Sequence, residues 1–99
     1  MEISVQLKSV HSFQTVLAQL KLRHLRVIDA LVEAKSVSGA AALLHITQPA
    51  VSKTLREIEE ILDAALFHRS PQGLSLTDYG RVVLVHSQQL QGQLRRLVE

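Results

Sequence analysis

Apolar residues recur every three or four positions over three stretches of the chain, which is the spacing of one face of an α-helix. The first stretch runs from Arg23 to Ala34, where charged side chains occupy the other side of an amphipathic helix. The second begins near Gln48 and ends around Asp63 or Ala64. Its predicted buried stripe consists of Ala50, Val51, Leu55, Ile58, Ile61 and Leu62. The third stretch, about residues 78–98, predicts a long helix.

A short helix is predicted between the first two. Residues 36–52 contain no acidic side chain and no Lys or Arg, and the run 40–44 favours helix, with Ser38 as its predicted N-cap. Thr47 is the predicted N-cap of the next helix, and Pro49 lies in the first turn, where its missing N–H costs nothing. Two helices joined by about three residues favour a helix-turn-helix.

A β-hairpin is predicted next. Residues 66–69 and 74–77 flank the segment 70–73, Ser-Pro-Gln-Gly, whose residues form turns. A hairpin after a helix-turn-helix is a wing. The predicted fold is therefore mainly α, a winged helix-turn-helix with a short two-stranded wing. The long helix that follows begins after the predicted N-cap Thr77.

The first twenty residues are harder to assign. Ile3, Val5 and Leu7 alternate, and a helical recurrence then predicts a short helix from about Ser12. We divide the chain into an N-terminal extension (1–20), a winged helix-turn-helix (21–77) and a linker or dimerisation helix (78–99).

Composition narrows the function classes. The chain has 99 residues, 46% of them hydrophobic and 20% charged, which is typical of one globular domain. No cysteine is present, so disulfide frameworks and thiolate zinc fingers are excluded and the expected compartment is the cytoplasm. No apolar run is long enough to span a membrane. Three aromatic residues are too few for a base-stacking, single-strand platform.

Catalytic motifs are missing from the sequence. The five histidines form no HExxH pattern and no i, i+4 pair, and no GxSxG motif surrounds a serine. We therefore expect neither an enzyme nor a bound metal or cofactor.

The more informative feature is the charge along the second amphipathic helix. Lys53 and Arg56 are the only charges in its first half, whereas its second half is acidic. Together with Gln48 and Ser52 they form a predicted exposed face near the N-terminus. Amide and guanidinium groups there can bind base edges in a major groove, and Lys or Ser can hold phosphates. An ordinary solvated face is the alternative.

Two further groups of residues are candidates for contacts. Arg69 and Gln72 lie in the predicted wing, whose tip would approach a DNA backbone or minor groove. In the long helix, apolar or small side chains recur at heptad spacing and predict a dimerisation seam of Val83, Ser87, Leu90, Leu94 and Leu97. The alternative is a single helix packed on its own domain.

Over about residues 21–98, the sequence resembles the N-terminal DNA-binding domain of LysR-type transcriptional regulators. The segments concerned are LKLRHLRVIDALVEAKSVS, GAAALLHITQPAVSKTLREIEEILDAALFHR and LSLTDYG. The resemblance implies promoter DNA as partner, with the recognition helix, about 48–63, in the major groove and the wing, about 66–77, near the backbone or minor groove. It also implies a homodimer through the linker helix, and a tetramer in full-length members of the family.

By the same resemblance, the residues at the DNA are Thr47, Gln48, Pro49, Ser52, Lys53 and Arg56, with Arg69 at the backbone; Ser38 is a further candidate, since its helix start can receive phosphate. Gln72 stands where many relatives have Arg, and the first twenty residues exceed the usual start of the family. Members of the family continue after the linker helix into an effector-binding domain. Residues 1–99 contain no counterpart of that domain, so we expect no effector site here.

Two other functions remain open from the sequence. One is a protein-interaction module, in which the final helix and the N-terminal segment bind partners without nucleic acid. The other is a small metal-dependent hydrolase that uses the scattered histidines, which a stoichiometric metal analysis would test.

Overall fold

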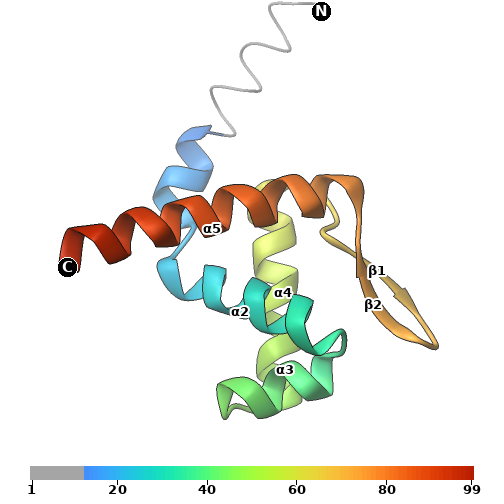
Figure 1. The fold of residues 1–99 in the computed structure, drawn as a ribbon. Coiled ribbons are helices and arrows are strands. Elements are labelled where there is room, and N and C mark those ends of the chain that lie inside the picture. The colour runs from blue at the N-terminus through green and yellow to red at the C-terminus, as the bar shows by residue number, and fades with distance from the viewer. Residues whose placement is uncertain (1–12) are drawn as a thin grey trace, which may run out of the picture.

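The computed structural model describes residues 13–99 and has the predicted order of elements. These are helices α2 (Leu22–Ala34), α3 (Val37–Leu44) and α4 (Gln48–Leu62), strands β1 (Phe67–Ser70) and β2 (Gly73–Leu76), and helix α5 (Asp78–Val98) (Figure 1). Residues 13–19 are also helical, in agreement with the short helix predicted from about Ser12. The alternating stretch Ile3 to Leu7 lies outside the described residues. The winged helix-turn-helix prediction is confirmed.

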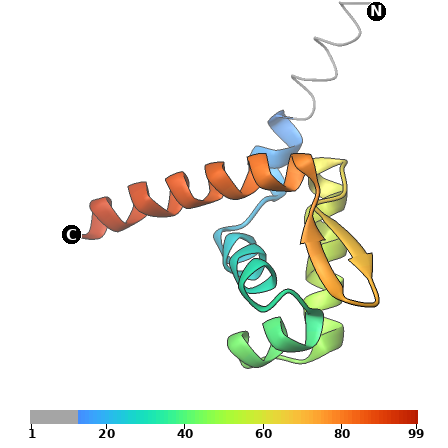
Figure 2. The same cartoon turned by 45° about the vertical axis from the view of Figure 1, so that its right-hand side comes forward.

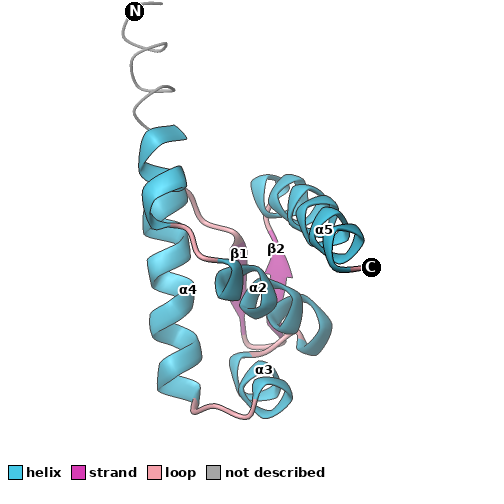
Figure 3. Ribbon diagram, turned by 90° about the vertical axis from the view of Figure 1, so that its left-hand side faces the viewer, coloured by secondary structure: helices cyan, strands magenta, loops and turns pink. Residues whose placement is uncertain are grey.

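The core lies between α2, α3 and α4. Ile28 and Leu31 of α2 meet Val51, Leu55 and Ile58 of α4, and all five are at most 1% exposed. The small residues Ala40 and Ala41 of α3 are also buried in this cluster, which allows α3 to approach the other two helices closely. Figure 3 shows α2 beside α4, with α3 below it. Of the predicted stripe of α4, Ala50, Ile61 and Leu62 are only half-buried.

Helix α2 begins with a reciprocal cap. The backbone N–H of Lys21 donates to Nδ1 of His24 over 3.1 Å, and the His24 N–H donates to the Lys21 carbonyl over 2.9 Å. The His24 ring is 3% exposed, and its Nε2 lies 4.0 Å from Oε1 of Glu57. Burial, followed by the neighbouring Arg23, lowers the pKa of His24 below its usual value, while Glu57 acts in the opposite direction. The ring is therefore a neutral acceptor at its Nδ1.

The predicted N-cap of α3 is wrong by two residues. Ser36, not Ser38, is the cap, and its Oγ accepts from the Gly39 N–H over 3.0 Å. Helix α2 ends at Ala34, and its C-cap Lys35, whose φ of 59° is left-handed, immediately precedes Ser36. The α2–α3 connection is thus shorter than expected, and Ser38 already lies in the first helical turn, where it is exposed.

The caps predicted for the other two helices are confirmed. Thr47 Oγ1 accepts from the Ala50 N–H over 3.2 Å at the start of α4. Thr77 Oγ1 accepts from the Gly80 N–H over 2.9 Å at the start of α5, and its hydroxyl donates to the Ala65 carbonyl over 2.8 Å. The second bond ties the start of α5 to the loop before the wing.

The hairpin is antiparallel, with Phe67 opposite Leu76 and Ser70 opposite Gly73, so both strands shift by one residue from the predicted ranges. The hairpin contacts the end of α2 next to its turn, because the Leu74 N–H donates to the Lys35 carbonyl over 2.9 Å. Gly73, at a φ of 118°, permits this approach, since a Cβ there would lie 2.4 Å from the same oxygen. The wing is therefore fixed against the helix-turn-helix.

Helix α5 crosses the body of the molecule at its N-terminal end and extends away from it toward the C-terminus (Figure 2). At the crossing, Gly80 lies against the chain before the wing, where a Cβ would be 2.1 Å from the Leu66 carbonyl oxygen. Within residues 13–99, no helix is both long and apolar enough to cross a membrane.

Candidate nucleic-acid interface

The first half of α4 presents polar and basic side chains outside its core stripe. Gln48, Lys53 and Arg56 are exposed and Ser52 is half-buried, while Val51 and Leu55 are fully buried. Their spacing places the four polar residues on one continuous side of the helix. We call this set, Gln48, Ser52, Lys53 and Arg56, the recognition face.

The second half of α4 is unsuited to a polyanion. Glu57, Glu59, Glu60 and Asp63 follow Arg56 along the helix. Glu59 has a structural role, because its Oε2 accepts from the Leu66 N–H over 2.7 Å and so holds the chain that leads into the wing. The charge gradient therefore directs any polyanion to the N-terminal end of α4.

The helix starts near the recognition face supply further donors. Ser38 is exposed in the first turn of α3, and Thr47 and Pro49 are exposed at the start of α4. The Thr47 oxygen already accepts the capping bond, so its hydroxyl proton remains a donor. Groups that donate at a helix N-terminus suit phosphate oxygens.

The wing lies at the same end of the molecule. In Figures 1 and 2 the hairpin tip, α3 and the start of α4 all lie on the side away from α5. Arg69 and Gln72 are exposed on the hairpin, and Ser70 shapes its turn by accepting from the Gln72 N–H over 3.3 Å. The recognition face and the wing can thus meet one extended ligand.

One basic residue near the wing was not among the site residues predicted from the sequence. Lys35 is exposed, and its carbonyl accepts the hydrogen bond that fixes the hairpin turn. The contact joins two segments that are distant in the sequence, so periodicity could not find it. The only local signal was Gly73, which suggested a turn but not its neighbour.

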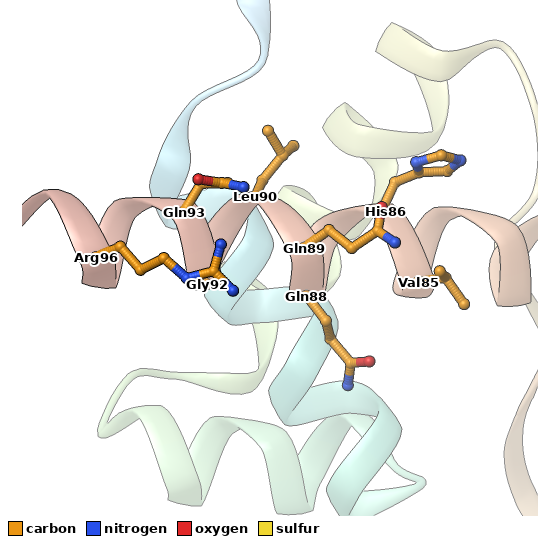
Figure 4. Close-up of a pocket in the computed structure, with 8 residues that line it drawn as sticks. All are labelled: Val85, His86, Gln88, Gln89, Leu90, Gly92, Gln93 and Arg96. Carbon is orange, nitrogen blue, oxygen red and sulfur yellow. The ribbon is translucent and has the colours of Figure 1, made fainter.

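The residues of the predicted dimerisation seam do not share one environment. Ser87 is 2% exposed and lies against α2, and Val83 packs on the core, with Leu94 half-buried. Leu90 and Leu97, in contrast, are 52% and 81% exposed. Figure 4 shows a shallow hollow on the outer side of α5, where Leu90 and Gln93 extend along one edge and Gln88 along the other. Only part of the predicted seam is therefore free to contact another chain.

A metal centre has no support in the described part of the chain. Within residues 13–99, the acidic and histidine side chains form no group of three that could hold a metal ion. The chemistry available at the wing and α4 is hydrogen bonding and charge.

Three helices, of which α3 and α4 form the helix-turn-helix, together with a two-stranded wing and a basic recognition face, define a winged helix-turn-helix protein. Residues 22–81 match the family of bacterial regulatory helix-turn-helix proteins described as the lysR family. The chain belongs to this LysR family.

Individual relatives agree with the family assignment. The chain is 40% identical over 81 residues to the HTH-type transcriptional regulator PcaQ of Agrobacterium fabrum, a match that covers 82% of this chain and 26% of that protein. It is 38% identical over 80 residues to the RuBisCO operon transcriptional regulator of Allochromatium vinosum, covering 81% and 26%. The chain thus spans about a quarter of the length of these relatives. Both are regulators by name, in agreement with the expectation that the chain is not an enzyme.

Solved structures show the same fold. The BenM_DBD/catB site 1 DNA complex superposes with a TM-score of 0.75 at 32% identity, over 80% of this chain and 89% of that one. The CbnR_DBD–DNA complex gives a TM-score of 0.74 at 28% identity, over 78% and 88%.

Proposed function

We propose that this chain binds double-stranded DNA sequence-specifically, as the DNA-binding part of a LysR-type transcriptional regulator. The observation that supports this most directly is the recognition face, which displays an exposed amide, lysine and arginine on a helix whose Val51 and Leu55 are fully buried. The two structural neighbours named above are DNA complexes of the same fold. A bacterial protein with this ligand would work in the cytoplasm, at the nucleoid when bound.

The contacts divide into two kinds. Gln48 has an amide donor and acceptor and Arg56 has parallel guanidinium donors, and both can bind base edges in a major groove, with Ser52 and Lys53 beside them. Ser38, Thr47, Arg69 and Gln72 lie at helix starts or on the wing, where contacts to phosphates set orientation without selecting sequence. Pro49 fixes the first turn of α4 between these groups.

The second copy of the chain is the other proposed partner. Leu90 and Leu97 leave apolar area exposed two helical turns apart on one side of α5, where a second chain could bury it. We assign these two residues to a homodimer, with Val83 and Leu94 at its edge. Ser87, buried within its own domain, supports the interface only indirectly. In the longer regulators of the family, tetramers and effector binding would involve parts of the protein outside the described residues.

The experiment is a fluorescence anisotropy titration. Duplexes that the chain enriches from a random-sequence library are compared with scrambled duplexes of equal composition across a salt series. We expect a preference for the enriched duplexes and a steep loss of affinity with salt, because phosphate contacts release counterions. Binding without preference would contradict sequence-specific recognition. Absence of binding at low salt would contradict the whole proposal and favour the interaction module.

A further inference from the structure

A polar contact joins the middle of α5 to α2. Nε2 of Gln91 donates to Oδ2 of Asp29 over 2.9 Å and to Oγ of Ser87 over 3.2 Å. Ser87 and Gln91 are one helical turn apart, so both face α2. We call Asp29, Ser87 and Gln91 the α2–α5 clamp.

A contribution to stability does not explain why the clamp is polar. Oδ1 of Asp29 is buried and accepts no hydrogen bond from the described residues. A buried carboxylate oxygen that accepts no hydrogen bond lowers the stability of the fold. An apolar pair of similar size would fill the same space without that loss. A hydrogen bond differs from an apolar contact in that it fixes direction and register. The geometry of the clamp therefore indicates that it orients α5.

Two specific contacts add to the packing of Val83 and Leu84 on the core in fixing the direction of α5. The first is at its start, where Thr77 and Gly80 hold the helix against the segment before the wing. The second is the clamp, about 16 Å further along at 1.5 Å per residue. The helix continues to Val98 with most of its side chains exposed. A tilt of about 10° at Gly80 would displace Val98 by about 5 Å, more than the rise of one base pair.

We propose that Asp29, Ser87 and Gln91 are positioning residues that set the spacing between the two DNA half-sites accepted by a pair of chains. The inference rests on the proposed function, since it requires DNA binding and a dimer through α5. In such a pair, the distance between the two recognition faces depends on the angle that α5 makes with the helix-turn-helix of the same chain. The clamp holds that angle.

The test exchanges donor and acceptor within the clamp. Duplexes enriched by the wild-type chain are rebuilt with their half-sites moved apart or together one base pair at a time, and the affinity is measured for each spacing. Gln91→Glu places two carboxylates against each other and breaks the contact. Adding Asp29→Asn restores a hydrogen bond with reversed polarity. Gln88→Glu makes the same charge change at an exposed position of α5 and is the matched control.

We expect the wild type and Gln88→Glu to share one preferred spacing, favoured about tenfold over neighbouring ones. This preference should fall below about twofold in Gln91→Glu and return in the double variant, with unchanged affinity for a single half-site. A role in stability alone would alter melting temperatures without changing the spacing profile. If Gln91→Glu does not fold, the apolar pair Asp29→Leu with Gln91→Leu replaces it, and we expect a folded protein with a broadened profile.

The possible failures are distinguishable. A wild-type spacing profile in Gln91→Glu, or in the apolar pair, would overturn the inference. Enrichment of single half-sites only, by the wild type, would overturn it while the proposed DNA binding stands. If the wild-type chain enriches no sequence, the proposed function and the inference both fail.

Discussion

His24 combines a structural contact with a titratable ring. Its Nδ1 accepts the Lys21 N–H at the start of α2, so protonation at that atom removes the hydrogen bond. The ring is 3% exposed, and burial, then Arg23, lowers its pKa, so the folded protein binds fewer protons than the unfolded chain just below the usual histidine pKa of 6.5. The free energy of unfolding therefore rises with pH through that window.

We predict that stability decreases as the pH falls below 6.5, until the folded-state pKa is passed. Urea unfolding curves at a series of pH values measure this dependence. His24→Gln, which keeps an acceptor, should reduce the slope, whereas His86→Gln at an exposed position should not. An unchanged slope in His24→Gln would show that another group is responsible.

At the recognition face, Lys53 and Arg56 are the charged residues whose removal should reduce affinity. Each is exposed, so alanine at either position should leave the thermal melt nearly unchanged. Affinity for an enriched duplex should fall by about 1–3 kcal/mol where the side chain binds a base. Arg96→Ala removes an exposed arginine from α5 instead and is the control. If anisotropy gives equal affinity for all three variants, Lys53 and Arg56 of the recognition face do not contact DNA.

The N-cap of α3 can be tested by substitution at Ser36 and Ser38. Ser36 accepts the Gly39 N–H and Ser38 is exposed in the first turn, so only Ser36 satisfies an otherwise free backbone donor. Ser36→Ala should destabilise the protein by about 1 kcal/mol, and Ser38→Ala by much less. Denaturant midpoints of the two variants measure the difference. Equal losses would mean that the cap alternates between the serines.

Two glycines of α5 have opposite surroundings. A Cβ at Gly80 would lie 2.1 Å from the Leu66 carbonyl oxygen, whereas a Cβ at Gly92 would meet nothing within 4 Å. Gly80→Ala should therefore separate α5 from the wing and lower the melting temperature. Gly92→Ala should raise stability by up to about 1 kcal/mol, because alanine favours helix. A loss of stability in Gly92→Ala at concentrations where the protein is dimeric would reveal a neighbour on that side.

At the scale of elements, the features set by local sequence were predictable and those set by distant contacts were not. Periodicity and the caps Thr47 and Thr77 located α4 and α5 nearly to the residue. The end of α2 at Ala34 was also predicted, whereas the N-cap of α3 was missed because Ser36 and Ser38 are both of a residue type that caps helices. Heptad spacing could not tell that Ser87 would be buried against α2, since its partner Gln91 bonds a residue 62 positions away.

In the whole molecule, the start of α4 and the tip of the wing lie at one end and α5 lies at the other (Figures 1 and 2). This separation lets a second chain bind α5 without covering the groups that we propose contact DNA. Each chain would then contribute one recognition helix, and the affinity for two linked half-sites would exceed that for one through effective concentration.

The exposed apolar residues of α5 allow this arrangement to be tested. Leu90→Glu combined with Leu97→Glu places charge where a second chain would bury apolar surface, while both positions are solvent-exposed in the single chain. We expect sedimentation at tens of micromolar to give a dimer for the wild type and a monomer for this variant, with similar melting of the isolated domain. Affinity for paired half-sites should fall about tenfold or more, and affinity for one half-site should not change. Val85→Glu, also exposed but on another side of α5, is the matched control. A dimer that survives in the double variant, or a wild type that sediments as a monomer, would place the contact between chains elsewhere, because Ser87 and the core-facing Val83 are already occupied within their own domain.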